Sequence, residues 1–237
     1  MRPHLPMAAI ALLLSAAAAA QAETLPLPDG LVALASEQGE ALLFGAEARS
    51  DFAPLSAQFV TQVNPAFCGP ATIAMVLNAL DLPRPPSDAT LGLGLFDQDN
   101  VFTAAAETAK PRAEVLRGGM TLDDLGAILE TYDLDVVVTH AEDTSPDAFR
   151  KAAVAGLNDR DDFVLVNYLR SAMGQEKGGH ISPLAAYDAD TDRFLVLDVS
   201  RYKYPPIWVD AETLYGAMNT PDGDNGGKSR GFVFVGR

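Results

Sequence analysis

The stretch Gln62-Val63-Asn64-Pro65-Ala66-Phe67-Cys68-Gly69-Pro70 is the most informative part of this 237-residue sequence. It holds the single cysteine, and apolar residues then recur at helical spacing: Ile73, Val76, Leu77 and Leu80. We therefore predict a helix that begins at Cys68, with Pro70 in its first turn. The positive end of a helix dipole favours a thiolate, so Cys68 is a candidate nucleophile and Gln62 a candidate donor to an oxyanion. The alternative is a small, buried and inert cysteine.

A thiol nucleophile needs a base, and the sequence offers few histidines. Apart from His4 near the N-terminus, they are His140 and His180. His180 follows two glycines and opens an apolar stretch, so a substrate could approach its ring, whereas His140 ends a valine-rich stretch and fits a structural role. Asp198 closes the apolar run Phe-Leu-Val-Leu, where an unpaired carboxylate is costly. A hydrogen bond from the His180 ring to Asp198 would satisfy it and fix the tautomer.

Residues 1–22 are expected to form a secretory signal peptide that is not part of the fold. Arg2 precedes the apolar run Met7–Ala20, and Ala20-Gln21-Ala22 gives a small-x-small cleavage pattern. The run is short and alanine-rich for a membrane span, and an uncleaved anchor is the alternative. We therefore expect a periplasmic or secreted protein with no membrane partner after cleavage, in which residues 23–237 form a single catalytic domain.

The charge balance narrows the class of partner. There are 17 Lys and Arg against 32 Asp and Glu, a net charge of −15, and removal of the predicted leader would leave −16. This charge opposes binding to nucleic acid or to anionic membranes, and an anionic substrate would need local cations. An exported chain with one cysteine cannot form an internal disulfide, so the thiol is either inert or kept for chemistry.

The apolar patterns predict an α+β fold, with a helical first half and an antiparallel sheet in the second half. Helices are expected near Ser36–Phe44, from Cys68, from Thr121, and from Ser145 towards Asn158. Strands are expected at Asp135–Val138, Phe163–Leu169, Ile181–Tyr187, Phe194–Val199 and Phe232–Val235. The segment Arg84–Met120 has no clear period and is expected to cover the site with loops and short helices.

Metal sites are poorly supported, and we expect neither a metal ligand nor a cofactor. Two histidines and one cysteine after the leader leave no HExxH or CxxC spacing. Asp188–Asp192 and Asp222–Asp224 imitate the start of a calcium loop. The first has Arg193 where the sharp-turn glycine should be, and the twelfth positions are Val199 and Val233. Both segments fit turns between strands better.

Several segments together resemble the bacterial phytochelatin synthase-like proteins. They are Gln62–Leu80, Met120–Gly126, Asn167–Val199, Arg201–Val209, Ala217–Thr220 and Arg230–Val235, within a similarity that extends from about Leu25 to the C-terminus. The most specific part is Gly-Gly-His180-Ile-Ser-Pro, followed by Leu-Asp198-Val-Ser-Arg-Tyr-Lys-Tyr-Pro-Pro. Members of that family are papain-fold cysteine peptidases that act on glutathione.

The resemblance implies a papain-like fold and a triad of Cys68, His180 and Asp198 in papain order, with Gln62 in the oxyanion hole. Cys68 would then attack the cysteinyl–glycine bond of glutathione. Glycine would leave, and a γ-glutamylcysteinyl thioester would remain on the enzyme.

The resemblance also points to residues that bind substrate. Asn167 and Arg170 belong to the family's NYLR stretch, and Gly179 stands directly before the candidate base. Arg170 is expected to hold a substrate carboxylate, because an arginine can do so with two parallel hydrogen bonds. Arg230 is the second candidate for this role.

Three functions are compatible with these residues. The leading one is an exported glutathione-processing enzyme whose partner is glutathione, free or as a metal complex. It would mainly hydrolyse glutathione to γ-glutamylcysteine and glycine, with minor transfer to a second glutathione, because the sequence ends at Arg237 without the Cys-rich C-terminal region of plant and yeast phytochelatin synthases. The alternatives are a papain-like peptidase for other small γ-glutamyl or peptide substrates, and a periplasmic binding protein with a degenerate site. The sequence leaves open whether the protein is a monomer or a homodimer.

Overall fold

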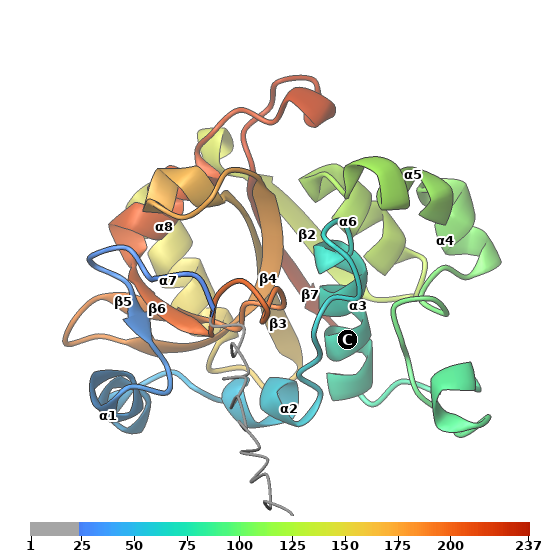
Figure 1. Ribbon diagram of the computed structural model, residues 1–237, viewed down its shortest axis with the longest axis horizontal. Helices are drawn as coiled ribbons and strands as arrows, with labels where there is room; N and C mark the ends of the chain where they lie inside the picture. Colours follow the sequence, from blue (N-terminus) through green and yellow to red (C-terminus); the bar gives the residue numbers. More distant parts are fainter. Residues whose placement is uncertain (1–23) are drawn as a thin grey trace, which may run out of the picture.

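The computed structural model describes residues 24–237, so the predicted leader lies outside the described residues. In residues 24–237 the strands form one seven-stranded sheet in the order β1-β6-β5-β4-β3-β7-β2 (Figure 1). Their bounds are β1 Val32–Ala33, β2 Asp135–His140, β3 Asp162–Leu169, β4 Gly179–Asp188, β5 Arg193–Val196, β6 Ile207–Asp210 and β7 Gly231–Gly236. Every neighbouring pair is antiparallel.

Helices cover both faces of this sheet. The α-helices are α1 Glu37–Gly45, α2 Phe52–Ala57, α3 Cys68–Ala79, α4 Ala104–Ala109, α5 Arg112–Gly118, α6 Leu122–Glu130, α7 Pro146–Gly156 and α8 Ala211–Met218. Helix α3 and the group α4 to α6 lie on one side of the sheet, and α7 and α8 lie on the other (Figure 1). No helix in the described part of the chain is long and apolar enough to cross a membrane.

The two faces of the sheet bury separate apolar cores. Because side chains alternate along a strand, Leu165 of β3 packs with α3 and α6, whereas Val164 and Val166 pack with α7 and α8. Helix α3 is buried from Cys68 to Asn78, which explains why its sequence is apolar almost all round. A helix held on every side is a rigid support for a reactive group at its first residue.

The α+β prediction is confirmed, and most expected elements are present within a few residues of their predicted bounds. The division into a helical half and a sheet half is less strict, since β2 precedes α7, and α8 lies between β6 and β7. Strand β6 and helix α8 were not expected. For β6 the reason is that an apolar run of three residues after two prolines gives no clear period. Strand β5 ends at Val196, so Asp198 lies in the irregular segment after it and not in the strand.

Candidate active site

Cys68 is the first residue of α3, and a tight turn leads into it. The Asn64 side chain accepts a hydrogen bond from Ala66 N at 2.9 Å, and Phe67 N donates to Asn64 O at 3.2 Å. Phe67 is the N-cap residue and supplies no side-chain cap. Within residues 24–237 the Cys68 N–H has no hydrogen-bond acceptor. This end of α3 therefore keeps free N–H donors beside the sulfur.

Gly69 and Thr72 fix the place of α3 against its neighbours. A Cβ atom at Gly69 would collide with the Met120 sulfur, so only glycine lets Met120 pack beside the start of the helix. Thr72 Oγ1 donates to Ile181 O at 3.3 Å, which joins α3 to β4 one residue after His180. These contacts bring the predicted nucleophile and the predicted base together.

The His180 ring is held by partners on neighbouring strands and turns. Its Nε2 atom lies 2.9 Å from Asp198 Oδ1 and 3.0 Å from Ser182 Oγ, and the ring also has a side-chain hydrogen bond with Cys68. Tyr168 lies opposite His180 in the β3–β4 ladder and packs edge-on against its ring at 5.6 Å. The structure thus brings Cys68, His180 and Asp198 into one connected group.

The electrostatics of this group favour a charged Cys68–His180 pair. Burial works to raise the pKa of Cys68, but the hydrogen bond and charge of His180, the backbone of Ile181 and the charge of Arg170 together lower it below its ordinary value. Burial works to lower the pKa of His180, but the charge and hydrogen bond of Asp198 raise it. Burial opposes the charged form of Asp198 as well, yet His180 and Arg170 hold its pKa well below the usual range. A thiolate beside an imidazolium is the reactive state of thiol enzymes.

Gln62 is near this group, but its side-chain amide is already engaged. Its backbone N–H donates to Val199 O at 2.9 Å, next to Asp198 in sequence. Its Nε2 atom donates to Asn64 O at 2.8 Å and to the Tyr202 hydroxyl at 3.0 Å, and its Oε1 atom is buried without a partner. Gln62 does not line the pocket in this structure, so an oxyanion role requires the amide to exchange one of these partners.

The structure does not support substrate binding by Arg170. Its side chain is 4% exposed, lies 2.8 Å from both oxygens of Asp198, and donates to Gln175 Oε1 at 2.6 Å. It is not among the residues that line the pocket. The sequence could not reveal this, because the NYLR stretch continues into a short 3₁₀ helix that turns the guanidinium towards Asp198.

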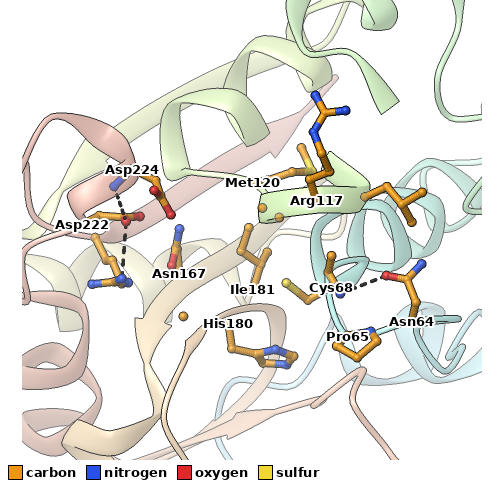
Figure 2. Close-up of a pocket in the computed structure, with 16 residues that line it drawn as sticks. Asn64, Pro65, Cys68, Arg117, Met120, Asn167, His180, Ile181, Asp222 and Asp224 are labelled. Atoms are coloured by element: carbon orange, nitrogen blue, oxygen red, sulfur yellow. Dashed lines mark hydrogen bonds and ion pairs between the residues drawn. The ribbon is translucent and has the colours of Figure 1, made fainter. Parts of the chain in front are cut away.

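A cavity of about 540 Å³ opens beside Cys68 and His180. Figure 2 shows these two residues on one side, with Asn167, Asp222 and Asp224 across the pocket from them. The predicted binding residues Asn167, Gly179 and Arg230 also line it, as do Arg117 and Met120. The cavity thus combines a nucleophile with cationic, anionic and amide groups.

Arg230, which lines this cavity, has one N–H donor without a partner. Its Nη1 atom donates to Pro221 O at 2.6 Å and to Thr220 Oγ1 at 3.1 Å, and Nη2 lies 3.4 Å from Asp222 Oδ1. Its Nε–H is buried without a partner. A Cβ atom at Gly179 would lie 3.3 Å from that Nε, so glycine there keeps the approach open. A buried, unpaired N–H donor is costly until an acceptor arrives.

Sequence reasoning missed three groups near the reactive pair. Ser182 could have been found, because it follows His180 by two residues and therefore shares its side of β4. Asp222 and Asp224 were interpreted only as a turn, and nothing in their spacing shows that the turn forms a wall of the pocket.

His140 has the structural role that was predicted for it. Its ring nitrogens lie 2.6 Å from Ser229 O and 2.8 Å from Asp123 Oδ1, and His140 is not among the residues that line the pocket. Among residues 24–237, no group of three or more His, Cys, Asp or Glu side chains is arranged to hold a metal ion.

Comparison with known proteins identifies the family of this chain. The sequence profile described as phytochelatin synthase matches residues 22–232. The chain belongs to the phytochelatin synthase family. It is 34% identical to glutathione gamma-glutamylcysteinyltransferase 1 of Lotus japonicus and 34% identical to the enzyme of that name from Triticum aestivum, in each case over 90% of this chain and 42% of the relative. It is 29% identical to the glutathione gamma-glutamylcysteinyltransferase of Schizosaccharomyces pombe, over 76% of this chain and 42% of the relative. The chain thus spans about two fifths of the length of these phytochelatin synthase relatives.

Proposed function

We propose that this protein cleaves the cysteinyl–glycine bond of glutathione through a thioester on Cys68. The observation that carries the proposal is the connected group of Cys68, His180 and Asp198 at the edge of a pocket that Arg230 also lines. The names of the relatives supply the substrate, and the site supplies chemistry that suits it.

In the proposed reaction the Cys68 thiolate attacks the carbonyl carbon of the substrate's cysteinyl residue. The His180 imidazolium gives its proton to the glycine nitrogen as the C–N bond breaks, and glycine leaves. Water then attacks the thioester while His180 accepts its proton, which releases γ-glutamylcysteine and restores the thiol. Asp198 holds the ring in position throughout.

The negative oxygen of each tetrahedral intermediate needs donors that are already in place. The Cys68 N–H is free in the described structure, and we assign it to this role. Gln62 can supply a second donor if its Nε2 exchanges the Tyr202 hydroxyl for the substrate oxygen, which leaves its bond to Asn64 O intact.

Selection for a γ-glutamyl group follows from the far side of the pocket. That group ends in a free α-carboxylate and a free α-ammonium, which an ordinary internal peptide bond lacks. The Nε–H of Arg230 suits the carboxylate, the Asn167 amide can assist it, and Asp222 and Asp224 suit the ammonium. These contacts favour a γ-glutamyl substrate over the alternative of general small peptides.

We further propose that hydrolysis exceeds transfer to a second glutathione. A second anionic tripeptide must bind a chain with a net charge of −15 and loses association entropy, whereas water needs only a base. The N-terminal apolar run supports export to the periplasm or the medium as part of the proposal.

The test is incubation of the purified protein with glutathione, followed by quantification of glycine and mass spectrometry of the protein. We expect glycine release and a γ-glutamylcysteinyl adduct on Cys68, neither of which occurs with Cys68→Ala. The isomeric α-Glu-Cys-Gly peptide should be cleaved much more slowly.

Bound glutathione without glycine release would favour a binding protein, and equal cleavage of both peptides would favour a general peptidase. Dipeptide-extended product in excess of γ-glutamylcysteine, with or without cadmium ions, would overturn the preference for hydrolysis.

A further inference from the structure

Asp198 contacts two cations, Arg170 and His180, and both of them meet its Oδ1 atom. Its Oδ1 accepts from Arg170 Nη2 at 2.8 Å, from His180 Nε2 at 2.9 Å and from Ser200 N at 2.8 Å. Arg170 Nη2 also lies 2.8 Å from Oδ2 as an ion-pair contact. An orienting carboxylate that served His180 alone would not need a second, fully buried cation.

The structure fixes Arg170 from several directions. Its backbone N–H donates to Gly178 O at 3.0 Å, its Nη1 donates to Gln175 Oε1 at 2.6 Å, and Gln175 N returns a hydrogen bond to Arg170 O at 3.1 Å. The guanidinium lies 5.2 Å from the centre of the Tyr204 ring. Because the side chain is buried, solvent screens its charge weakly.

We infer that Arg170 is a positioning residue for the catalytic pair. It holds Asp198 in place and offsets part of the carboxylate charge beside His180. It thereby sets the pH range in which the Cys68 thiolate and the His180 imidazolium are present together. This role is independent of the substrate, because it concerns groups present in the free protein.

The sign of the effect is the same for both members of the pair. The charge of Arg170 lowers the pKa of Cys68, because it favours the thiolate, and lowers the pKa of His180, because it disfavours the imidazolium. Loss of that charge should therefore move both titrations to higher pH. The other titratable groups that face Arg170 are Asp198, Tyr168 and Tyr204. Burial raises the pKa of Tyr168 beyond the range of interest.

The pH dependence of Cys68 alkylation by iodoacetamide tests this role directly, because the chain contains one cysteine. In Arg170→Met we expect the midpoint of the rate profile to rise by roughly one pH unit. Arg150→Met is the matched control, since Arg150 makes an equally close two-point pair with Asp192, at 2.7 and 2.8 Å, and does not line the pocket. Its midpoint should not move.

A midpoint in Arg170→Met equal to that of the unaltered protein, or an equal rise in Arg150→Met, would overturn the inference. If Arg170→Met does not fold, Arg170→Lys carries the test. Lysine keeps the charge but lacks the second nitrogen that holds Gln175 Oε1, so the charge is less firmly placed and we expect a smaller rise, about a third to a half of a unit. A midpoint in folded Arg170→Lys at or below that of the unaltered protein would also overturn it. Because alkylation needs no glutathione, failure here is separate from failure of the proposed reaction.

Discussion

The reactive residues depend on one another because each is buried. Cys68, His180 and Asp198 are all less than 9% exposed, so every charge among them must be balanced by another. Arg170 completes the set, and the charges alternate from thiolate to imidazolium to carboxylate to guanidinium. Changing one member therefore alters the titration of the others.

Asp198→Asn should lower kcat/KM for glycine release by roughly 10- to 10⁴-fold, because the NH₂ group of the new amide can donate to His180 and hold its ring in the wrong tautomer. The variant should also lose stability, since Arg170 would keep a buried charge without its carboxylate. Steady-state kinetics and thermal unfolding measure the two effects. Asp123→Asn, which alters the similar His140–Asp123 contact at 2.8 Å, is the control and should leave kcat/KM within about twofold. Similar kinetics in the two variants would contradict the triad.

Arg230→Lys should mainly raise KM for glutathione. Lysine keeps the charge but lacks the Nε–H, which has no partner in the described structure, and a charge-assisted hydrogen bond contributes about 1.5–3 kcal/mol, or roughly 10- to 100-fold in KM. Lys228→Gln alters a cation in the same segment that pairs with Asp123 at 2.8 Å, and it should leave KM unchanged. An unaltered KM in Arg230→Lys would move the carboxylate site elsewhere.

Among the elements, helix α3 must be accessible at its first turn and buried on its other sides. Its first turn must expose free N–H groups to the pocket while its other sides are buried against the sheet and against the loop that carries Met120. The Met120 side chain packs against Gly69, which has no side chain of its own, and the hydrogen bond of Thr72 to Ile181 fixes the distance from α3 to β4. The position of the nucleophile is thus a property of helix packing as much as of the local sequence.

Gly69→Ala should destabilise the protein by about 1–3 kcal/mol and reduce kcat, because the new methyl group must displace Met120 at the entrance of α3. Denaturant unfolding and glycine-release kinetics measure both changes. Gly216→Ala in α8 is the matched helical control, since its Cβ would meet no atom within 4 Å. It should be neutral or stabilising by up to about 1 kcal/mol. Equal effects of the two substitutions would rule out the packing explanation.

At the scale of the whole molecule, the excess of acidic residues has consequences for stability. Asp51 is fully buried, and both of its carboxylate oxygens lack a hydrogen-bond partner. Burial, followed by the charges of Asp162 and Asp159, raises its pKa to about 8. The folded protein therefore keeps a proton on Asp51 in a pH range where the unfolded chain has already released it.

This difference predicts stability that falls as pH rises from about 4 to about 8 and then no longer depends on Asp51. Asp51→Asn removes that dependence, so it should raise Tm at pH 8 relative to the unaltered protein and do so much less at pH 5. A gain of about 2 kcal/mol corresponds to roughly 4–8 °C. Asp29→Asn, at an exposed position, removes the same formal charge and serves as the control. An equal Tm shift at both pH values would mean that Asp51 is not protonated in the fold.

The sequence by itself determined the local features of the protein. The start of α3 at Cys68, the capping box that opens α6 at Thr121, and the central strands β3 and β4 follow from spacing and end signals that act within a few residues. The predicted elements were therefore mostly correct. The sequence also limited the candidates for the reactive residues, because one cysteine and two histidines after the leader left few combinations.

Only the tertiary structure decided which side chains meet. It turned Arg170 away from the pocket and onto Asp198, placed Asp222 in the wall of the pocket, and engaged Gln62 with Tyr202, which is 140 residues away in sequence. Strand β6 exists because it pairs with β5, although its own sequence is too short to show a period. Such contacts depend on how distant segments pack and on the need to pair buried charges, and neither leaves a pattern in the neighbouring residues.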